Sequence, residues 1–215
     1  MYIGEMTLLI VAVLVMTGLA KGITSRLHFN DAVASVAIFL IVLLNVRGGI
    51  PLGKSFSLSL GGVLSVALCL YAFLRRSERP YDLFLGFLSM LGTAGITFLY
   101  TLHFLSAIKL DPRLLACLLS FLVGLWSAFA AKRTFASCLF SSVAGSFLGV
   151  TLYLVFIRKG GNIGGNYTFT VMWLGATIGL LLQYLFAVMM RVMKSPRSDS
   201  YFEAGEMQDE EEKKE

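Results

Sequence analysis

Seven apolar segments follow one another along almost the whole chain, and only short polar turns separate them. They comprise residues 6–20, 32–46, 56–74, 83–105, 114–131, 134–157 and 167–190. A helix needs about 20 apolar residues to cross the hydrocarbon core of a bilayer, and most segments approach that length. Charged residues make up 14% of the chain, against about 25% in soluble domains. The pattern predicts an all-α membrane protein with about seven transmembrane helices.

Two of the seven segments have ambiguous ends. The second is short and stops at Asn45 and Arg47, whereas the fourth is long and continues through His103 toward Lys109. The sequence leaves open whether the second helix is a full span and whether the fourth is one long span.

The Lys and Arg residues are divided unevenly between the two sets of turns. With the N-terminus outside, twelve face the cytoplasm and six face the other side. The six are Arg47, Lys54, Lys109, Arg113, Arg158 and Lys159. Because cytoplasmic turns carry an excess of Lys and Arg, we expect a multipass protein of the cell (cytoplasmic) membrane, with the N-terminus outside and the C-terminus cytoplasmic. Basic residues at helix ends contact lipid headgroups, so membrane lipids are expected partners and nucleic acid is not.

The composition changes abruptly after residue 190. Residues 1–190 form the predicted helical bundle, and residues 191–215 hold eight of the 13 acidic residues. A segment this polar cannot bury a core, so we expect a disordered acidic cytoplasmic tail. The tail is either a solvated end or a docking segment for a protein partner, and the sequence leaves the oligomeric state open.

Two glycine-rich segments precede the third and seventh apolar segments. Residues 48–54 lead into Ser57 and Ser59, and residues 160–166 lead into Thr168 and Thr170. In both places hydroxyl side chains alternate with apolar ones, which is typical of extended chain rather than of a lipid-facing helix. We therefore expect extended or unwound backbone at the start of both helices, and such backbone must be buried in protein or face water.

The two glycine-rich segments lie 111 residues apart, which indicates an internal repeat. Helices one to three would correspond to helices five to seven, with helix four as a linker, in a 3+1+3 arrangement. Both segments then face the outside, so the repeats would be parallel, as in some small transporters.

A polar cavity would form if the two glycine-rich segments met. Its candidate residues are Lys54, Ser57, Ser59, Asn166, Thr168 and Thr170. Their amides and hydroxyls suit a small polar or anionic solute. The alternative is a pair of ordinary surface loops whose hydroxyls bond back to the helix.

Small residues point to close helix packing. The candidate packing residues are Gly145, Gly149, Gly175 and Gly179. Their GxxxG spacing allows helix backbones to approach, and we expect helices six and seven to pack through them. The cysteines, Cys69, Cys117 and Cys138, all lie in apolar segments without disulfide or zinc spacing, so we interpret them as packing residues.

Acidic residues are almost absent from the predicted spans. Glu5, Asp31, Glu78, Asp82 and Asp111 lie at or near predicted helix ends, where capping or interface solvation explains them. Without paired carboxylates in the bilayer core, the sequence argues against proton-coupled transport and hydrolysis.

Other chemistry-bearing residues are equally sparse. Asn45 and Gln183 are neutral and predicted to bond between helices. His28 and His103 fall on opposite sides of the membrane, which disfavours a metal site, and no HExxH or GxSxG motif occurs. We therefore expect no catalytic residue, no metal and no cofactor.

The first third of the chain resembles a known family. Residues 26–32, then Ile50-Pro51-Leu52, then residues 57–64 resemble the uncharacterised prokaryotic membrane proteins of the domain-of-unknown-function 1614 family. The resemblance implies a bacterial or archaeal cytoplasmic membrane and no assigned activity. It also implies an aspartate in the second glycine-rich segment, which residues 160–170 lack.

Three functions remain open at this point. The leading hypothesis is a non-enzymatic transporter or channel for a small solute, with the polar cavity between the glycine-rich segments. The second is a membrane scaffold or regulatory component that acts through partners. The third is a membrane-interface enzyme acting on lipid, which would need His28, Asp31 or Asp111 in a cleft.

Overall fold

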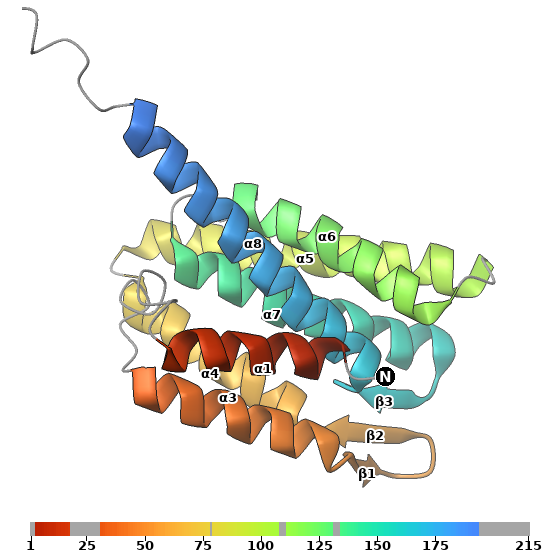
Figure 1. The fold of residues 1–215 in the computed structure, drawn as a ribbon. Helices are drawn as coiled ribbons and strands as arrows, with labels where there is room; N and C mark the ends of the chain where they lie inside the picture. The colour runs from red at the N-terminus through yellow and green to blue at the C-terminus, as the bar shows by residue number, and fades with distance from the viewer. Residues whose placement is uncertain (1–2, 18–30, 78, 108–110, 131–133, 194–215) are drawn as a thin grey trace, which may run out of the picture. The chain divides into compact units, whose positions relative to one another are not determined.

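A computed structural model describes residues 3–17, 31–77, 79–107, 111–130 and 134–193 (Figure 1). Its α-helices are α1 (Ile3–Met16), α3 (Asp31–Val46), α4 (Leu60–Arg76), α5 (Pro80–Ala107), α6 (Pro112–Ala130), α7 (Phe135–Tyr153) and α8 (Asn166–Met193). A π-helical turn, η1 (Leu154–Arg158), continues α7. One of these helices overlaps each predicted apolar segment, because uninterrupted apolar runs leave the backbone no partner in lipid except its own chain.

Four helical segments in the described part of the chain are long and apolar enough to cross a membrane. They are Pro80–Phe104, Pro112–Ala130, Phe135–Arg158 and Asn166–Met190. The helices α1 and α3 are apolar but shorter. The chain is thus a helical membrane protein, and the fourth predicted segment is one continuous helix of 28 residues.

The chain divides into two compact units, residues Met1–Gln183 and Tyr184–Glu215. The first unit holds the helices up to most of α8 and every residue discussed below. In the second unit only the end of α8 falls among the described residues, and the predicted acidic tail beyond residue 193 lies outside them.

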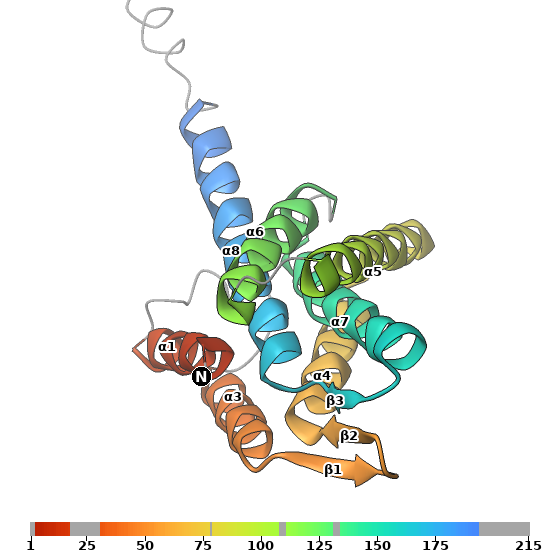
Figure 2. The same cartoon turned by 90° about the vertical axis from the view of Figure 1, so that its right-hand side faces the viewer.

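A small three-stranded sheet corrects the prediction of an all-α protein. Its strands are β1 (Gly49–Leu52), β2 (Phe56–Ser59) and β3 (Gly161–Ile163). The strand β2 lies in the middle, antiparallel to β1 and parallel to β3, as Figure 2 shows. Pro51 lies in β1 at the free edge, where its missing N–H discourages pairing with another chain.

The expectation of extended backbone before two helices is right once and wrong once. Residues Phe56–Ser59 form β2, as predicted. Residues 167–171 instead form the first turns of α8, and the extended chain lies upstream, in β3. Within the helix the Thr170 hydroxyl is satisfied, because it donates to the Asn166 carbonyl oxygen 2.7 Å away.

The helices of the first unit alternate in direction. The helices α5 and α7 run the same way, because Ser89 lies opposite Ser141 and Thr97 lies opposite Gly149. The chain leaves α3 into β1 and enters α4 from β2, while β3 lies between η1 and α8. The sheet therefore marks one end of this unit, where both glycine-rich segments lie (Figure 1).

The central contact of the unit joins α5 to α7. A Cβ atom at Gly149 would lie 2.5 Å from the Ala94 carbonyl oxygen, so the two backbones touch. Nearby, the Ser141 hydroxyl lies 2.9 Å from the Ser89 hydroxyl and 2.8 Å from the Thr93 hydroxyl. Close approach and buried hydroxyl bonds both stabilise helix pairs in membranes.

Three of the four GxxxG glycines have other partners than those predicted, and Gly179 alone of the four contacts the predicted neighbour, α7. Gly145 and Gly149 pack against α5 rather than against α8. Gly175 packs against Ser120 and Val123 of α6, and Gly179 against Ser127 of α6 and Cys138 of α7. Spacing identifies a close-packing face, but not the helix that covers it.

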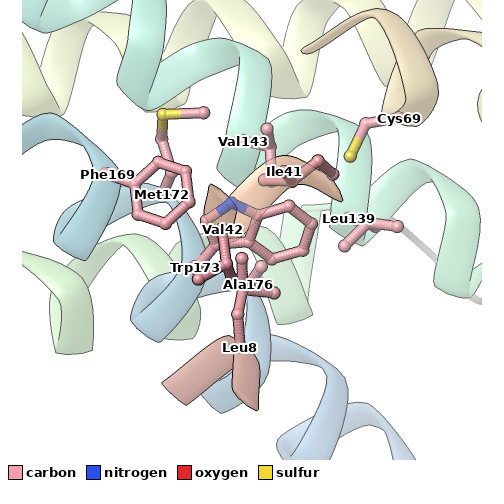
Figure 3. Packing of buried hydrophobic residues seen from close by; sticks show 10 residues of the cluster. All are labelled: Leu8, Ile41, Val42, Cys69, Leu139, Val143, Phe169, Met172, Trp173 and Ala176. Atoms are coloured by element: carbon pink, nitrogen blue, oxygen red, sulfur yellow. The ribbon is translucent and has the colours of Figure 1, made fainter. Parts of the chain in front are cut away.

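A second packed region joins α1, α3, α4, α7 and α8. Its buried members are Leu8, Ile41, Val42, Cys69, Leu139, Val143, Phe169, Met172, Trp173 and Ala176 (Figure 3). The Trp173 indole N–H donates to the Ser65 hydroxyl at 3.2 Å. Cys69 and Cys138 are free and buried, and Cys117 is free and half-buried.

Candidate functional site: a buried carboxyl where helix ends meet

Glu5 is buried, which corrects its assignment to a capped or solvated helix end. The helix α1 begins at Ile3, three residues before the predicted start, so Glu5 lies within its first turn. Only 2% of the Glu5 side chain is exposed. A carboxyl group in an apolar bundle is costly to bury, and such groups in membrane proteins mark functional sites by default.

A chain of three hydrogen-bonded side chains contains this carboxyl. The Asn45 side-chain amide donates to Glu5 Oε1 at 2.5 Å, and the Ser59 hydroxyl donates to Asn45 Oδ1 at 2.6 Å. Asn45 and Ser59 are 5% and 1% exposed. The second carboxyl oxygen, Glu5 Oε2, is buried and has no hydrogen-bond partner. The group is thus anchored through one oxygen and unsatisfied at the other.

Glycines bring the backbones of this site together. A Cβ atom at Gly4 would lie 2.9 Å from the Phe169 carbonyl oxygen, so α1 touches the first turn of α8. A Cβ atom at Gly61 would lie 2.7 Å from the Ile41 carbonyl oxygen, so α4 touches the end of α3. Contacts this close require glycine, because any larger residue would displace a helix.

The site lies level with the middle of the α7 and η1 segment. A Cβ atom at Gly62 would lie 3.3 Å from the Phe147 ring and 3.0 Å from Gly164 Cα. Phe147 is twelve residues beyond Phe135 and eleven before Arg158, the bounds of this candidate span. The starts of α1, α4 and α8 and the end of α3 therefore meet about halfway along a helix that runs through.

The two glycine-rich segments meet through backbone pairing of β2 with β3. Ser57 pairs with Asn162, and Leu58 pairs with Ile163. A Cβ atom at Gly164, which has a φ of +75°, would lie 3.4 Å from Ser59 Cβ. Backbone thus fills the space between Ser59 and Gly164, in the region where the sequence predicts a polar cavity.

The candidate cavity residues divide into two groups. Ser59, Thr168 and Thr170 are buried and Ser57 is half-buried, whereas Lys54 and Asn166 are exposed. Only Ser59 joins the hydrogen-bonded chain with Glu5 and Asn45. Lys54 occupies the turn between β1 and β2, so it does not contribute a donor to the buried group.

An apolar cavity of about 260 Å³ lies deeper between α1, α3, α4, α7 and α8. Its lining includes Leu14, Val33, Ile38, Cys69, Trp173 and Leu181. Cavities of this kind stay dry and accept hydrocarbon, as engineered apolar cavities of roughly 150 Å³ do. The described lining is thus almost entirely apolar, unlike the surroundings of Glu5.

Of the three residues of the lipid-enzyme hypothesis, the structure describes the side chain of Asp111 alone. Asp111 is exposed, and its Oδ1 accepts from the Arg113 backbone N–H at 3.0 Å, which caps the start of α6. His28 and the Asp31 side chain lie outside what the structure describes. Among the described residues, no group of three or more His, Cys, Asp or Glu could hold a metal ion.

The predicted roles of Asn45 and Gln183 as bonds between helices are confirmed. The Gln183 amide donates to the Ala128 carbonyl oxygen of α6 at 3.4 Å. Asn45 bonds to α1 and to Ser59 at the N-cap of α4. Sequence reasoning found Asn45 and Ser59 but missed Glu5, which accepts from Asn45. The sequence feature that could have identified Glu5 as a buried residue is its position directly after Gly4, at the edge of an apolar segment.

Replacing Ser59 with alanine is expected to lower the free energy of unfolding by about 1–2 kcal/mol. The hydroxyl caps α4 by accepting from the Gly62 N–H at 3.4 Å, and it also satisfies the Asn45 amide oxygen. Ser57→Ala is the matched control on the same strand and should change stability by less than about 0.5 kcal/mol. Denaturant unfolding in detergent micelles measures both, and equal effects would contradict the assigned role of Ser59.

Comparisons of this chain with protein-family models, with curated proteins and with solved structures found no match.

Proposed function

We propose that the chain is a non-catalytic transporter for a small solute, with its solute path at the sheet end of the bundle. The observation that carries the proposal is the meeting of four helix ends around Glu5, Asn45 and Ser59, about halfway along the α7 and η1 segment. Transporters bind solutes near the bilayer midplane, where discontinuous helices end. Packing alone requires neither the break in the helices nor the buried acid.

Seven spans with the N-terminus outside and the C-terminus cytoplasmic are part of this proposal. The 16 residues of α3 cover about 24 Å and the four of β1 about 13 Å. Together they exceed the roughly 30 Å of a bilayer core. The strand β2 and the helix α4 together also exceed the roughly 30 Å of a bilayer core. Short helices that continue as paired strands thus give α3 and α4 a physical route to complete spans.

A parallel 3+1+3 repeat is consistent with the same geometry. The strands β2 and β3 are parallel neighbours, and they lead into α4 and α8, the last helices of the two proposed halves. The helix α5 would then be the linker. Separation of β2 from β3 is the movement that would open the sheet end to water, because their pairing brings Gly164 against Gly62.

Reaction of a buried cysteine with a membrane-impermeant methanethiosulfonate reagent tests the proposal without knowledge of the solute. In a background with Cys69, Cys117 and Cys138 replaced by alanine, Thr168→Cys introduces a thiol at a position that is 2% exposed. A transporter exposes this position to water in part of its cycle, so we expect the thiol to react from one face of the membrane.

Ala176→Cys is the matched control, because Ala176 is 1% exposed, lies on the same helix and lines the apolar cavity. It should stay unreactive. Mass spectrometry of intact protein measures the modification after treatment of cells and of inside-out vesicles. If Thr168→Cys is as unreactive as Ala176→Cys from both faces, the sheet end does not open and the transport proposal is wrong.

A further inference from the structure

We propose that the apolar cavity between α1, α3, α4, α7 and α8 binds one acyl chain of a membrane phospholipid, which enters from the leaflet away from the sheet. The inference goes beyond the proposed transport function and does not depend on it, because the cavity shares no lining residue with the group of Glu5, Asn45 and Ser59. The ligand at this second site is hydrocarbon, whereas the solute path is proposed at the sheet end.

The cavity results from the way α1 and α8 diverge. The two helices touch at the sheet end, where a Cβ atom at Gly4 would lie 2.9 Å from the Phe169 carbonyl oxygen. Toward the other end of α1, the described part of α8 turns away from α1, as Figure 1 shows. Leu14 of α1 and Leu180 of α8 line the space that this divergence leaves.

The position of the lining along α1 and α3 determines which leaflet supplies the acyl chain. Val33 of the lining lies 12 residues before Asn45 in α3, about 18 Å along the helix axis. Leu14 lies nine residues after Glu5 in α1, about 13 Å along the axis. This part of the lining therefore lies away from the sheet end, on the side of the cytoplasmic leaflet in the proposed orientation.

The described rim of the cavity is continuous with the apolar outer surface of the helices. Leu14, Val33 and Leu181 line the cavity, and they are also 39%, 60% and 51% exposed. Exposed apolar side chains of a membrane protein contact lipid tails, which are as apolar as leucine. Phospholipid is therefore the hydrocarbon that the bilayer supplies at this rim, and its acyl chain matches the chemistry of the lining.

The lining offers no free donor to a polar ligand, and its size fits part of an acyl chain. The Trp173 indole N–H donates to the Ser65 hydroxyl at 3.2 Å, and the Thr177 hydroxyl donates to the Trp173 carbonyl oxygen at 2.8 Å. Cys69 adds only a weakly polar thiol. An engineered cavity of roughly 150 Å³ binds benzene, so by proportion about 260 Å³ holds about ten carbon atoms of a chain.

Quenching of tryptophan fluorescence by brominated lipid tests the inference, because the chain has two tryptophans. Trp173 lines the cavity beside Leu139 and Ala176 and is 9% exposed (Figure 3), whereas Trp126 of α6 is 41% exposed. Trp126→Phe leaves Trp173 as the single fluorophore, and Trp173→Phe leaves Trp126. The full-length variants are reconstituted in phosphatidylcholine vesicles with and without bromine on one acyl chain. We expect the loss of Trp173 emission to be as large as that of Trp126, although Trp173 is buried.

A substitution that fills the cavity shows whether the quenching lipid occupies it. Ala37 of α3 is half-buried and lines the cavity, so Ala37→Leu in the Trp126→Phe background should reduce the quenching of Trp173. Ala67→Leu, on the exposed face of α4 and outside the lining, is the matched control and should leave the quenching unchanged. If Ala37→Leu fails to fold, Ala34→Leu makes the same test at a second half-buried position of the lining.

Two outcomes would overturn the inference. If Trp173 keeps its emission in brominated vesicles while Trp126 loses it, lipid does not enter, and a second copy of the chain or residues outside the described ones cover the cavity instead. If a folded Ala37→Leu variant is quenched as strongly as Ala67→Leu, bromine reaches Trp173 without occupying the cavity. Neither outcome bears on the reactivity of Thr168→Cys, so failure of the lipid site and failure of the transport proposal are distinguishable.

Discussion

Gly149→Leu is expected to prevent accumulation of folded protein, with a loss of about 3 kcal/mol or more in the free energy of unfolding. A Cβ atom at this position would lie 2.5 Å from the Ala94 carbonyl oxygen and 2.8 Å from Thr97 Cβ. The first of these atoms is backbone, so no side-chain rotation relieves the clash. The helices α5 and α7 would have to separate, and the hydroxyl contacts between them would be lost.

Gly95→Leu is the matched control on α5. Nothing lies within 4 Å of a Cβ atom at Gly95, which is exposed on the helix surface. This substitution should be neutral or stabilise by up to about 1 kcal/mol, because leucine is a better helix former than glycine. Size-exclusion chromatography and thermal unfolding in detergent measure both variants. Normal folding of Gly149→Leu would refute the close contact between α5 and α7.

Asn45→Leu should destabilise the protein by about 2–4 kcal/mol, the second largest effect expected. Without the Asn45 side-chain amide, Glu5 Oε1 has no donor and the Ser59 hydroxyl has no acceptor. Each buried polar group that loses its partner costs about 1–3 kcal/mol. Glu5→Gln should cost less than about 1 kcal/mol, because its amide oxygen can still accept from Asn45.

A double-mutant cycle isolates this interaction. Glu5→Leu combined with Asn45→Leu should be more stable than the sum of the two single effects implies, because the double variant no longer buries an acid without a donor. Denaturant unfolding in micelles gives the four free energies. Strict additivity would mean that Glu5 and Asn45 do not interact in the folded protein.

The substitutions with the largest expected effects on stability lie in two regions, and different contacts stabilise each region. The helices α5 and α7 are joined by direct backbone contact and by hydroxyls that satisfy one another. At the sheet end, one carboxyl oxygen has no partner, and the first turns of α1, α4 and α8 meet around it. Under the proposed function, the first region is the rigid scaffold and the second is the part that moves.

The apolar pattern was sufficient to predict where each helix lies and that the chain is a membrane protein. Uninterrupted apolar runs leave the backbone no partners in lipid except its own, so length and hydropathy decide helix positions locally. The small residues predicted to mark close packing, such as Gly149 and Gly175, do so. The extended start before α4 was equally readable, because alternation of hydroxyl and apolar residues is a local signal.

Contacts between distant residues were decided only by the tertiary structure. Glu5 meets Asn45 across 40 positions, β2 meets β3 across about a hundred, and Gly149 lies against Ala94 rather than against α8. Periodicity specifies which face of a helix is small or polar, but the partner of that face depends on how all the helices pack together. For that reason the sequence places Glu5 at a helix end near the membrane interface, although Glu5 is buried in the folded protein.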